Sequence, residues 1–392
     1  MSDTKKQGFS SSLGVLSVFL IWQFMIICTP VLKSLQTLYP DVPYSTIQLV
    51  STLPSLMIVP ASLISGNIVG KKIRYKTMCV LSIAVLFFAG LIPYFINSFA
   101  VLMASMVLFG IGEGLSQPLG NALAIKLYDK EKASNMVGLG GTVKNISDVV
   151  LQNLAGVVCV LNIKYVWLVH LLLIIPLLLI LFFLPEPVKE ETVVEEKPKE
   201  KVKLPGIAYI LSAAYGILFI VYYPLLLNMS AIVVGEEIGT AANAGTIASM
   251  YTIGGMVAGV AFSPMLKKLG KHTIPVSLVL QILGTACGYF GHSVFMFMAA
   301  EFITGISVYI IMFAIMMDFK AVLPNECVAP ASAFFVAVLQ FSAFLATLYS
   351  KLIVAVSGSE EPRLPIGIGL VFTLIISVVW IVAIYRKKQK EA

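Results

Sequence analysis

The sequence predicts an all-α integral membrane protein with about 12 transmembrane helices in two related six-helix bundles. Three observations predict this class. Of the 392 residues, 58% are hydrophobic and only 12% are charged, with a mean hydropathy of +0.94. Long apolar runs alternate with short polar turns along the whole chain, and several features recur in its second half. A soluble globular chain carries about twice this share of charged residues, so that class is excluded.

The apolar runs follow one another closely, and each is long enough to cross a bilayer. A crossing helix needs roughly 20 apolar residues, and several runs exceed this length, so we expect tilted or bent helices. The predicted spans are 13–38, 46–70, 77–97, 99–128, 133–161, 164–184, 205–230, 241–266, 273–291, 293–319, 328–356 and 364–385.

The net charge of +7 follows the positive-inside pattern of membrane proteins, which argues against a nucleic-acid partner. Basic residues gather at both termini and at alternate loops, within 71–76, 126–132, 267–271 and 386–390. The opposite loops carry Asp41, Asn97, Glu236, Glu237, Glu360 and Glu361. We therefore expect a multi-pass protein of the cell membrane, surrounded by the lipid bilayer, with both termini in the cytoplasm.

Recurring features indicate a duplicated six-helix half. A tight basic turn follows the second and the eighth run, about 196 residues apart, and Pro30 and Pro224 recur at nearly that separation. Between Pro185 and Pro205, mixed Glu and Lys with few large apolar residues cannot form a core. The predicted organisation is an N-terminal bundle over 1–184, a flexible cytoplasmic linker over 185–204 and a C-terminal bundle over 205–392.

Ionisable residues lie deep in one predicted hairpin, where the charged turn 129–132 joins the fourth and fifth runs. At about 1.5 Å per residue, Glu113 and Asp148 come to nearly the same depth, with Lys144 one turn closer to the hairpin turn. Charges at mid-membrane are costly and commonly mark a substrate, ion or proton pathway. The alternative is a neutral cluster that locks two helices together.

Polar residues continue from these charges at four-residue spacing, which places each row on one helix face. The rows are Glu113, Gln117 and Asn121 on the first helix, and Lys144, Asp148 and Gln152 on the second. The candidate substrate- or ion-binding set is therefore Glu113, Gln117, Asn121, Lys144 and Asp148.

The chain has two six-helix halves, a hydrophilic linker and basic turns after the second and eighth helices. In these features it resembles the major facilitator superfamily. The family signature in those turns has a Gly, then an acid, then basic residues and a second Gly. Gly66, Lys71 and Arg74 match in the first turn, where Gly70 replaces the acid and Ile73 the second Gly; in the second turn Lys268, Gly270 and Lys271 match, while Lys267 occupies the acid position. The matching residues are our candidate gating loops.

The resemblance implies a major facilitator fold whose first, fourth, seventh and tenth helices line a central cavity. Tyr222 and Tyr223 in the seventh helix are then candidate substrate contacts, although an aromatic row at helical spacing is equally typical of packing. Where the family often carries an Arg in the fourth helix, this chain has Met106, and the matching place in the tenth helix is Glu301. The fifth helix lacks the Gly-Pro signature of drug and proton antiporters.

We predict a secondary transporter that moves a small organic solute, such as an organic anion held by Lys144, by alternating access with proton coupling. Multidrug efflux by drug/proton antiport is the alternative within the class. A membrane receptor or enzyme needs a nucleophile with its base, a metal set or a large extramembrane domain, and the sequence has none of these. No nucleotide-binding loop is present, so the energy should come from a proton or another coupling ion. We expect no cofactor, no metal and a monomer.

Overall fold

The computed structural model describes residues 8–187 and 203–391, and these ranges are helical apart from turns and one isolated bridge between Val69 and Ile73. Most of the predicted linker 185–204 lies outside them. Eleven stretches of the described chain are long and apolar enough to cross a membrane. One of these, Ala241–Tyr289, has 49 residues and contains two helices joined by a short turn, so it covers two of the predicted spans. The predicted fold class is confirmed.

The first six predicted spans correspond to α1 (Phe9–Phe19), η1 (Leu20–Val31), α2 (Leu32–Leu38), α3 (Tyr44–Ile47), α4 (Leu49–Ile68), α5 (Tyr75–Phe95), α6 (Phe99–Ser116), α7 (Leu119–Leu127), α8 (Lys130–Leu161), η2 (Ile163–Leu173) and α9 (Ile174–Phe183). The other six correspond to α10 (Gly206–Tyr222), α11 (Pro224–Gly235), α12 (Ala241–Leu269), η3 (Gly270–His272), α13 (Thr273–Tyr289), α14 (Val294–Val322), α15 (Asn325–Ser357) and α16 (Leu364–Glu391). The elements labelled η are 3₁₀ helices.

The chain divides into two compact units, Met1–Cys28 with Val50–Glu196 and Thr29–Leu49 with Lys197–Ala392. The segment 29–49 belongs to the second unit because it is hydrogen-bonded to α11. The Tyr44 hydroxyl donates to the Leu227 carbonyl oxygen at 2.7 Å, and the Gln48 amide donates to the Asn228 side-chain oxygen at 2.9 Å. All four residues are buried. The two six-helix bundles predicted over 1–184 and 205–392 describe the order of the spans along the chain, and their limits stay a prediction.

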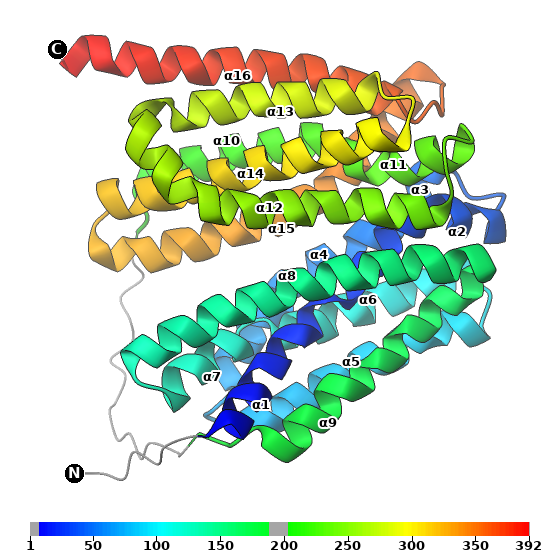
Figure 1. Cartoon of the computed structure of the whole chain (residues 1–392), viewed down its shortest axis with the longest axis vertical. Helices are drawn as coiled ribbons and strands as arrows, with labels where there is room; N and C mark the ends of the chain where they lie inside the picture. The colour runs from blue at the N-terminus through cyan, green and yellow to red at the C-terminus, as the bar shows by residue number, and fades with distance from the viewer. Residues whose placement is uncertain (1–7, 188–202, 392) are drawn as a thin grey trace. The chain divides into compact units, whose positions relative to one another are not determined.

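The same helix-packing seams occur inside each unit. In the first, α5 and α6 lie side by side, and the Ser82 hydroxyl donates to the Gly112 carbonyl oxygen at 2.5 Å (Figure 1). In the second, α13 and α14 lie side by side, and the Ser307 hydroxyl donates to the Ser277 carbonyl oxygen at 2.6 Å. The two pairs lie 195 residues apart in sequence, and in each a buried hydroxyl meets a carbonyl group on the neighbouring helix. This repetition is what a duplicated half predicts.

Glycines allow a second seam in each unit. A Cβ atom at Gly110 of α6 would collide with the backbone of Pro54 in α4. A Cβ atom at Gly305 of α14 would collide with the backbone of Tyr251 in α12. Helices that touch backbone to backbone in this way need glycine at the contact, as is common in membrane bundles.

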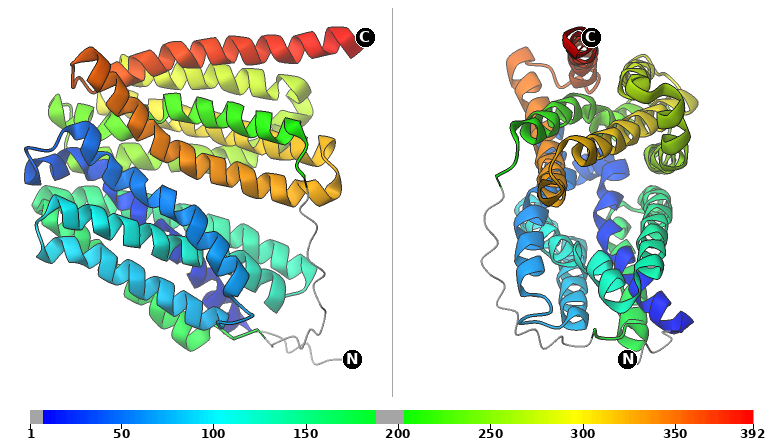
Figure 2. Two further views of the ribbon diagram at one scale, coloured as in Figure 1. Left: turned by 180° about the vertical axis from the view of Figure 1, so that it is seen from behind. Right: turned by 90° about the vertical axis from the view of Figure 1, so that its left-hand side faces the viewer.

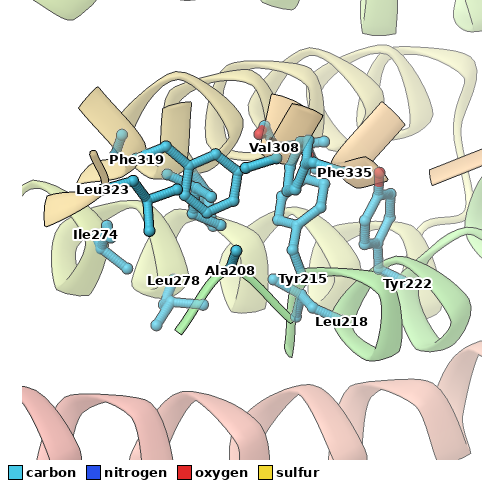
Figure 3. Close-up of a cluster of buried hydrophobic side chains, with 14 of the residues drawn as sticks. Ala208, Tyr215, Leu218, Tyr222, Ile274, Leu278, Val308, Phe319, Leu323 and Phe335 are labelled. Atoms are coloured by element: carbon cyan, nitrogen blue, oxygen red, sulfur yellow. Dashed lines mark hydrogen bonds between the residues drawn. The ribbon is translucent and has the colours of Figure 1, made fainter. Parts of the chain in front are cut away.

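The core of the second unit is built from α10, α13, α14 and α15 (Figure 3). Tyr215 lies beside Phe335, with ring centroids 5.2 Å apart, and its hydroxyl donates to the Val308 carbonyl oxygen at 2.9 Å. Figure 2 shows α15 running next to α10 on the side hidden in Figure 1. The aromatic side chains of α10 at the height of Tyr215 therefore mainly pack inside the core of the second unit.

Proline interrupts the first and the seventh span at related places. Pro30 lies in the 3₁₀ segment η1, and Pro224 starts α11 directly after α10. A proline lacks the N–H needed to continue an α-helix, which accounts for the start of α11 at Pro224. Pro30 lies near the end of η1, just before α2 begins.

Candidate functional site

Glu113 lies in the last turn of α6, beside an interruption of the fourth span. α6 ends at Ser116, and α7 begins only after Gln117 and Pro118. The indole N–H of Trp22 donates to the Ser116 carbonyl oxygen at 3.1 Å, so the end of α6 is capped by the first span. The Glu113 side chain is 9% exposed.

α8 presents the other charges of the predicted cluster. Its first turn is capped by Asp129, whose side chain accepts from the Lys132 N–H at 2.9 Å. Farther along the helix, Asp148 is buried and Lys144 is half-buried. The row predicted at four-residue spacing on α8 thus points away from the most exposed face of the helix.

The structure brings Glu113, Lys144 and Asp148 together. The charge of Lys144 acts on both carboxyl groups, and the charge of Asp148 acts on Glu113. One oxygen of Glu113 and one of Asp148 have no hydrogen-bond partner among the described residues. Two buried carboxyl groups therefore share a single cation, so the cluster can bind a proton or exchange its counter-charge for a ligand.

The other polar residues of the two rows lie in different surroundings. Gln152 is 2% exposed, one turn beyond Asp148. Gln117 lies in the turn after α6 and is half-buried, and Asn121 in α7 is exposed. Between α6 and α7 the backbones of Gln117 and Pro118 keep right-handed helical angles, so the row Glu113, Gln117 and Asn121 runs along one span that Pro118 interrupts in hydrogen bonding.

Tyr222 and Tyr223 lie where α10 gives way to α11. Tyr222 is 1% exposed, and its hydroxyl and that of Tyr251 form a hydrogen bond of 3.2 Å. Tyr223 is half-buried, and its ring stacks on Phe219 with centroids 4.7 Å apart. Tyr222 is held by packing, while Tyr223 is the more accessible of the two.

The first basic turn has a conformation that explains the missing acid. Gly70 has a φ of 77°, and its N–H donates to the Ile73 carbonyl oxygen at 2.7 Å. At such a φ a residue with a Cβ atom is strained, which favours glycine over an acid. Gly66, Lys71 and Arg74 are exposed around this turn.

A carboxylate from elsewhere in the chain forms hydrogen bonds with the backbone at the end of this turn. Glu186, just after α9, accepts from the backbone N–H groups of Tyr75 and Lys76 at 2.6 and 2.9 Å. It thereby caps the N-terminus of α5, where the helix dipole favours a negative charge. In the second basic turn, Lys268 and Lys271 are exposed and Gly270 has a φ of 53°.

The model of the family described as "Major Facilitator Superfamily" matches residues 11–230, more than half of the 392 residues. The chain belongs to the major facilitator superfamily. It is therefore a membrane transporter and not an enzyme, as the sequence predicted. No curated relative matches it in sequence.

Solved structures of this superfamily share the fold. A structure of a mutant of the nucleoside transporter NupG has a TM-score of 0.80 at 12% identity and covers 96% of this chain and 100% of its own. The occupied, inward-facing bacterial homologue of the human lysosomal transporter Spinster scores 0.76 at 13% identity, covering 98% and 97%. A D-xylose-proton symporter scores 0.71 at 13% identity, covering 94% and 97%. At these identities the likeness shows the fold alone.

Glu301 is the buried acid that residue patterns did not select as a site. It lies in the first third of α14, is 0% exposed, and neither of its carboxyl oxygens has a hydrogen-bond partner among the described residues. The signal available in the sequence was an acid deep within the apolar run 293–319, whose other acid, Asp318, lies at its end. No second charge lies at helical spacing from Glu301, so the spacing that pairs Lys144 with Asp148 does not point to it.

Proposed function

We propose that this transporter is a secondary carrier of a small organic anion, driven by protons and working by alternating access in the cell membrane, with both termini in the cytoplasm. The observation that carries this proposal is the cluster in which Lys144 acts on two buried carboxyl groups, Glu113 and Asp148. A lysine ammonium group is a suitable receptor for a carboxylate.

The arrangement links anion binding to proton binding. Without substrate, Lys144 balances the negative charge shared by Glu113 and Asp148. When a substrate carboxylate pairs with Lys144, the two acids lose their counter-charge in a low-dielectric site and bind a proton. The anion and the proton are then carried together, which is symport.

Uptake by purified protein in liposomes tests the substrate class. A panel of organic anions and lipophilic cationic dyes is offered with and without an imposed pH gradient. We expect an organic anion to accumulate when the outside is acidic, and to do so less when the gradient is absent. Export of cationic dyes without anion uptake would instead support drug/proton antiport.

A single variant separates coupling from binding. Glu113→Gln keeps the size of the side chain and removes its titration, so it should abolish accumulation against a gradient while substrate exchange stays measurable. Glu131→Gln, an exposed acid in the first turn of α8, is the control and should accumulate substrate like the parent. Accumulation by Glu113→Gln that still depends on pH would remove Glu113 from the coupling role.

A further inference from the structure

α14 packs closely against its neighbours at residues near Glu301 in the sequence. An added Cβ at Gly284 of α13 would lie 2.5 Å from the Thr304 hydroxyl oxygen of α14, and one at Gly254 of α12 would collide with the α14 backbone at Phe302. The Glu301 side chain itself is 0% exposed. A carboxyl group in such a close-packed part of the helix bundle can take up a proton more readily than it can contact an organic group.

Tyr223 is a polar group within electrostatic range of this acid. The charge of Glu301 acts on the Tyr223 phenol, which lies at the junction of α10 and α11. Tyr223 is half-buried, whereas Glu301 is fully buried, so the phenol is the more accessible of the two groups. A phenol can donate a hydrogen bond to a carboxylate and can also accept one from a carboxylic acid.

Among the described residues, α14 and the helices that contact it carry Lys, Arg or His only toward their ends. Away from the helix ends, the ionisable side chains of α14 and of the helices that contact it are all tyrosines, and α11 carries none. These tyrosines are Tyr215 and Tyr222 of α10, Tyr251 of α12 and Tyr309 of α14 itself. The groups toward the helix ends are Tyr209, Lys267, Lys268, Cys287, Tyr289, Asp318, Lys320, Glu326, Cys327, Tyr349 and Lys351.

This setting differs from that of Glu113, which has Lys144 within electrostatic range. A carboxylate buried with neither oxygen accepting a hydrogen bond is strongly disfavoured, whereas the neutral acid is tolerated. Glu301 therefore holds a proton in this conformation. When the surroundings change so that a donor reaches it, the same carboxyl group can release that proton.

We propose that Glu301 is a second proton-binding site of this transporter, chemically separate from the Glu113 cluster, with Tyr223 as the group that stabilises its ionised form. The reaction is the release and uptake of one proton by one carboxyl group, with the Tyr223 hydroxyl donating to the carboxylate that forms. The role of this site in coupling rests on the proposed function and extends it from one acidic site to two.

Infrared spectroscopy of the purified full-length protein tests the site without any substrate, because a neutral carboxylic acid has a C=O band that a carboxylate lacks. At about pH 7, where an ordinary exposed glutamate is ionised, the wild-type spectrum should contain a band that Glu301→Gln lacks. Glu326→Gln, an exposed acid at the start of α15, should retain this band. Glu113→Gln should also retain it.

Titration then separates a proton-exchanging site from a permanently neutral acid. The Glu301 band should disappear as the pH rises toward about 10, since buried glutamates that ionise near pH 8 to 9 are known. Tyr223→Phe removes the donor to the carboxylate, so the band should persist to higher pH in that variant. Tyr223→Phe keeps the acid and so tests the site even if Glu301→Gln fails to fold.

Two results would overturn the proposal. One is a spectrum in which Glu301→Gln removes no acid band at neutral pH. The other is a wild-type band that stays unchanged to about pH 10, which would make Glu301 a structural acid. Neither result affects the anion-uptake test of Glu113, so the second site can fail while the proposed function stands. Conversely, an infrared band assigned to Glu301 stands even if no anion is transported.

Discussion

The two halves of this protein share one helical frame but place different chemistry on it. α6 and α14 begin at Phe99 and Val294, and α8 and α15 begin at Lys130 and Asn325, so each pair is offset by 195 residues. At this sequence offset the charged residues of one half correspond to apolar residues in the other. Glu113, Lys144 and Asp148 correspond to Val308, Leu339 and Ala343, and Glu301 corresponds to Met106.

This difference separates what the frame requires from what function requires. The glycine contacts at Gly110 and Gly305 and the Ser82 and Ser307 hydrogen bonds occur in both halves because they let neighbouring helices touch. At each of these positions the residue is ionisable in one half and apolar in the other, so helix packing alone does not demand the ionisable residue. The first half carries acids with a cation beside them, and the second carries a lone acid beside tyrosines.

The largest effect is expected from breaking the charge cluster of the first half. Lys144→Met leaves Glu113 and Asp148 without their cation. Breaking a fully buried pair costs about 3 to 5 kcal/mol, and since Lys144 is only half-buried we expect at most about 3 kcal/mol. Leu339→Met, at the corresponding place in the second half, conserves volume and should cost less than about 1.5 kcal/mol. Melting temperatures of the two purified variants give the comparison.

The triple variant Lys144→Met, Glu113→Gln and Asp148→Asn decides whether the cluster is structural or binds substrate. Removing all three charges together should restore the melting temperature under either reading. If Lys144 holds the anion, the well-folded triple variant will not bind it, and Lys144→Arg will bind it with altered affinity. Parental affinity in a stable triple variant would show that the cluster only locks α6 to α8.

The glycine seams should be equally sensitive in both halves. Gly110→Ala and Gly305→Ala each place a methyl group against a neighbouring backbone that cannot yield, at a cost of about 1 to 3 kcal/mol. Gly138→Ala in α8 is the matched control, because nothing lies within 4 Å of its Cβ position. Alanine should there raise stability by up to about 1 kcal/mol through its helix propensity. If Gly110→Ala lowered stability and Gly305→Ala did not, the two glycine seams would not be equivalent.

The spans and the charge cluster could be predicted because hydropathy and helical spacing act locally along the sequence. Counting residues outward from the hairpin turn 129–132 predicted similar depths for Glu113, Lys144 and Asp148. The structure places these residues within electrostatic range of one another. Pro118 is the local signal for the interruption between α6 and α7, and the row from Glu113 to Asn121 stays a prediction.

Other features depend on contacts between distant parts of the chain, and spacing alone could not reveal them. Glu186 reaches the start of α5 across about 110 residues, so no sequence pattern links it to the basic turn where the family's acid is missing. The tyrosine beside Glu301 comes from another helix in the same way. A buried acid without a charged partner can be noticed in a sequence, but its surroundings require the fold.

The acid that caps α5 gives a smaller test of the comparison. Glu186→Gln removes the negative charge from two N–H groups at the helix N-terminus, which should lower stability by about 1 kcal/mol. The corresponding helix of the second half, α13, begins with no side-chain hydrogen bond from its N-cap residue His272. An unchanged melting temperature in Glu186→Gln would mean that solvent satisfies these N–H groups equally well.

The smallest expected effect comes from an ion pair found in the second half. Arg363 donates to both carboxylate oxygens of Glu236, at 2.7 and 2.6 Å, and to the carbonyl oxygens of Tyr289 and Gly291. It thus joins the ends of α11, α13 and α16. The sequence contains Arg74, Arg363 and Arg386 as its arginines, so the first half has no arginine at a corresponding loop.

This ion pair should make the second half sensitive to acid. The hydrogen bonds from Arg363 lower the pKa of Glu236, partial burial opposes them, and the charges of Arg363 and His292 add to the lowering. Because the pKa is lower in the folded state, the pair contributes its full stability above the ordinary glutamate pKa of about 4.3 and loses it as the pH falls through the lower folded value. The melting temperature of the parent should thus fall more steeply than that of Glu236→Gln between about pH 6 and about pH 3. Glu360→Gln, an exposed acid in the loop before Arg363, is the control and should follow the parent. Parallel curves for the parent and Glu236→Gln would show that Arg363 holds these loops through its carbonyl contacts alone.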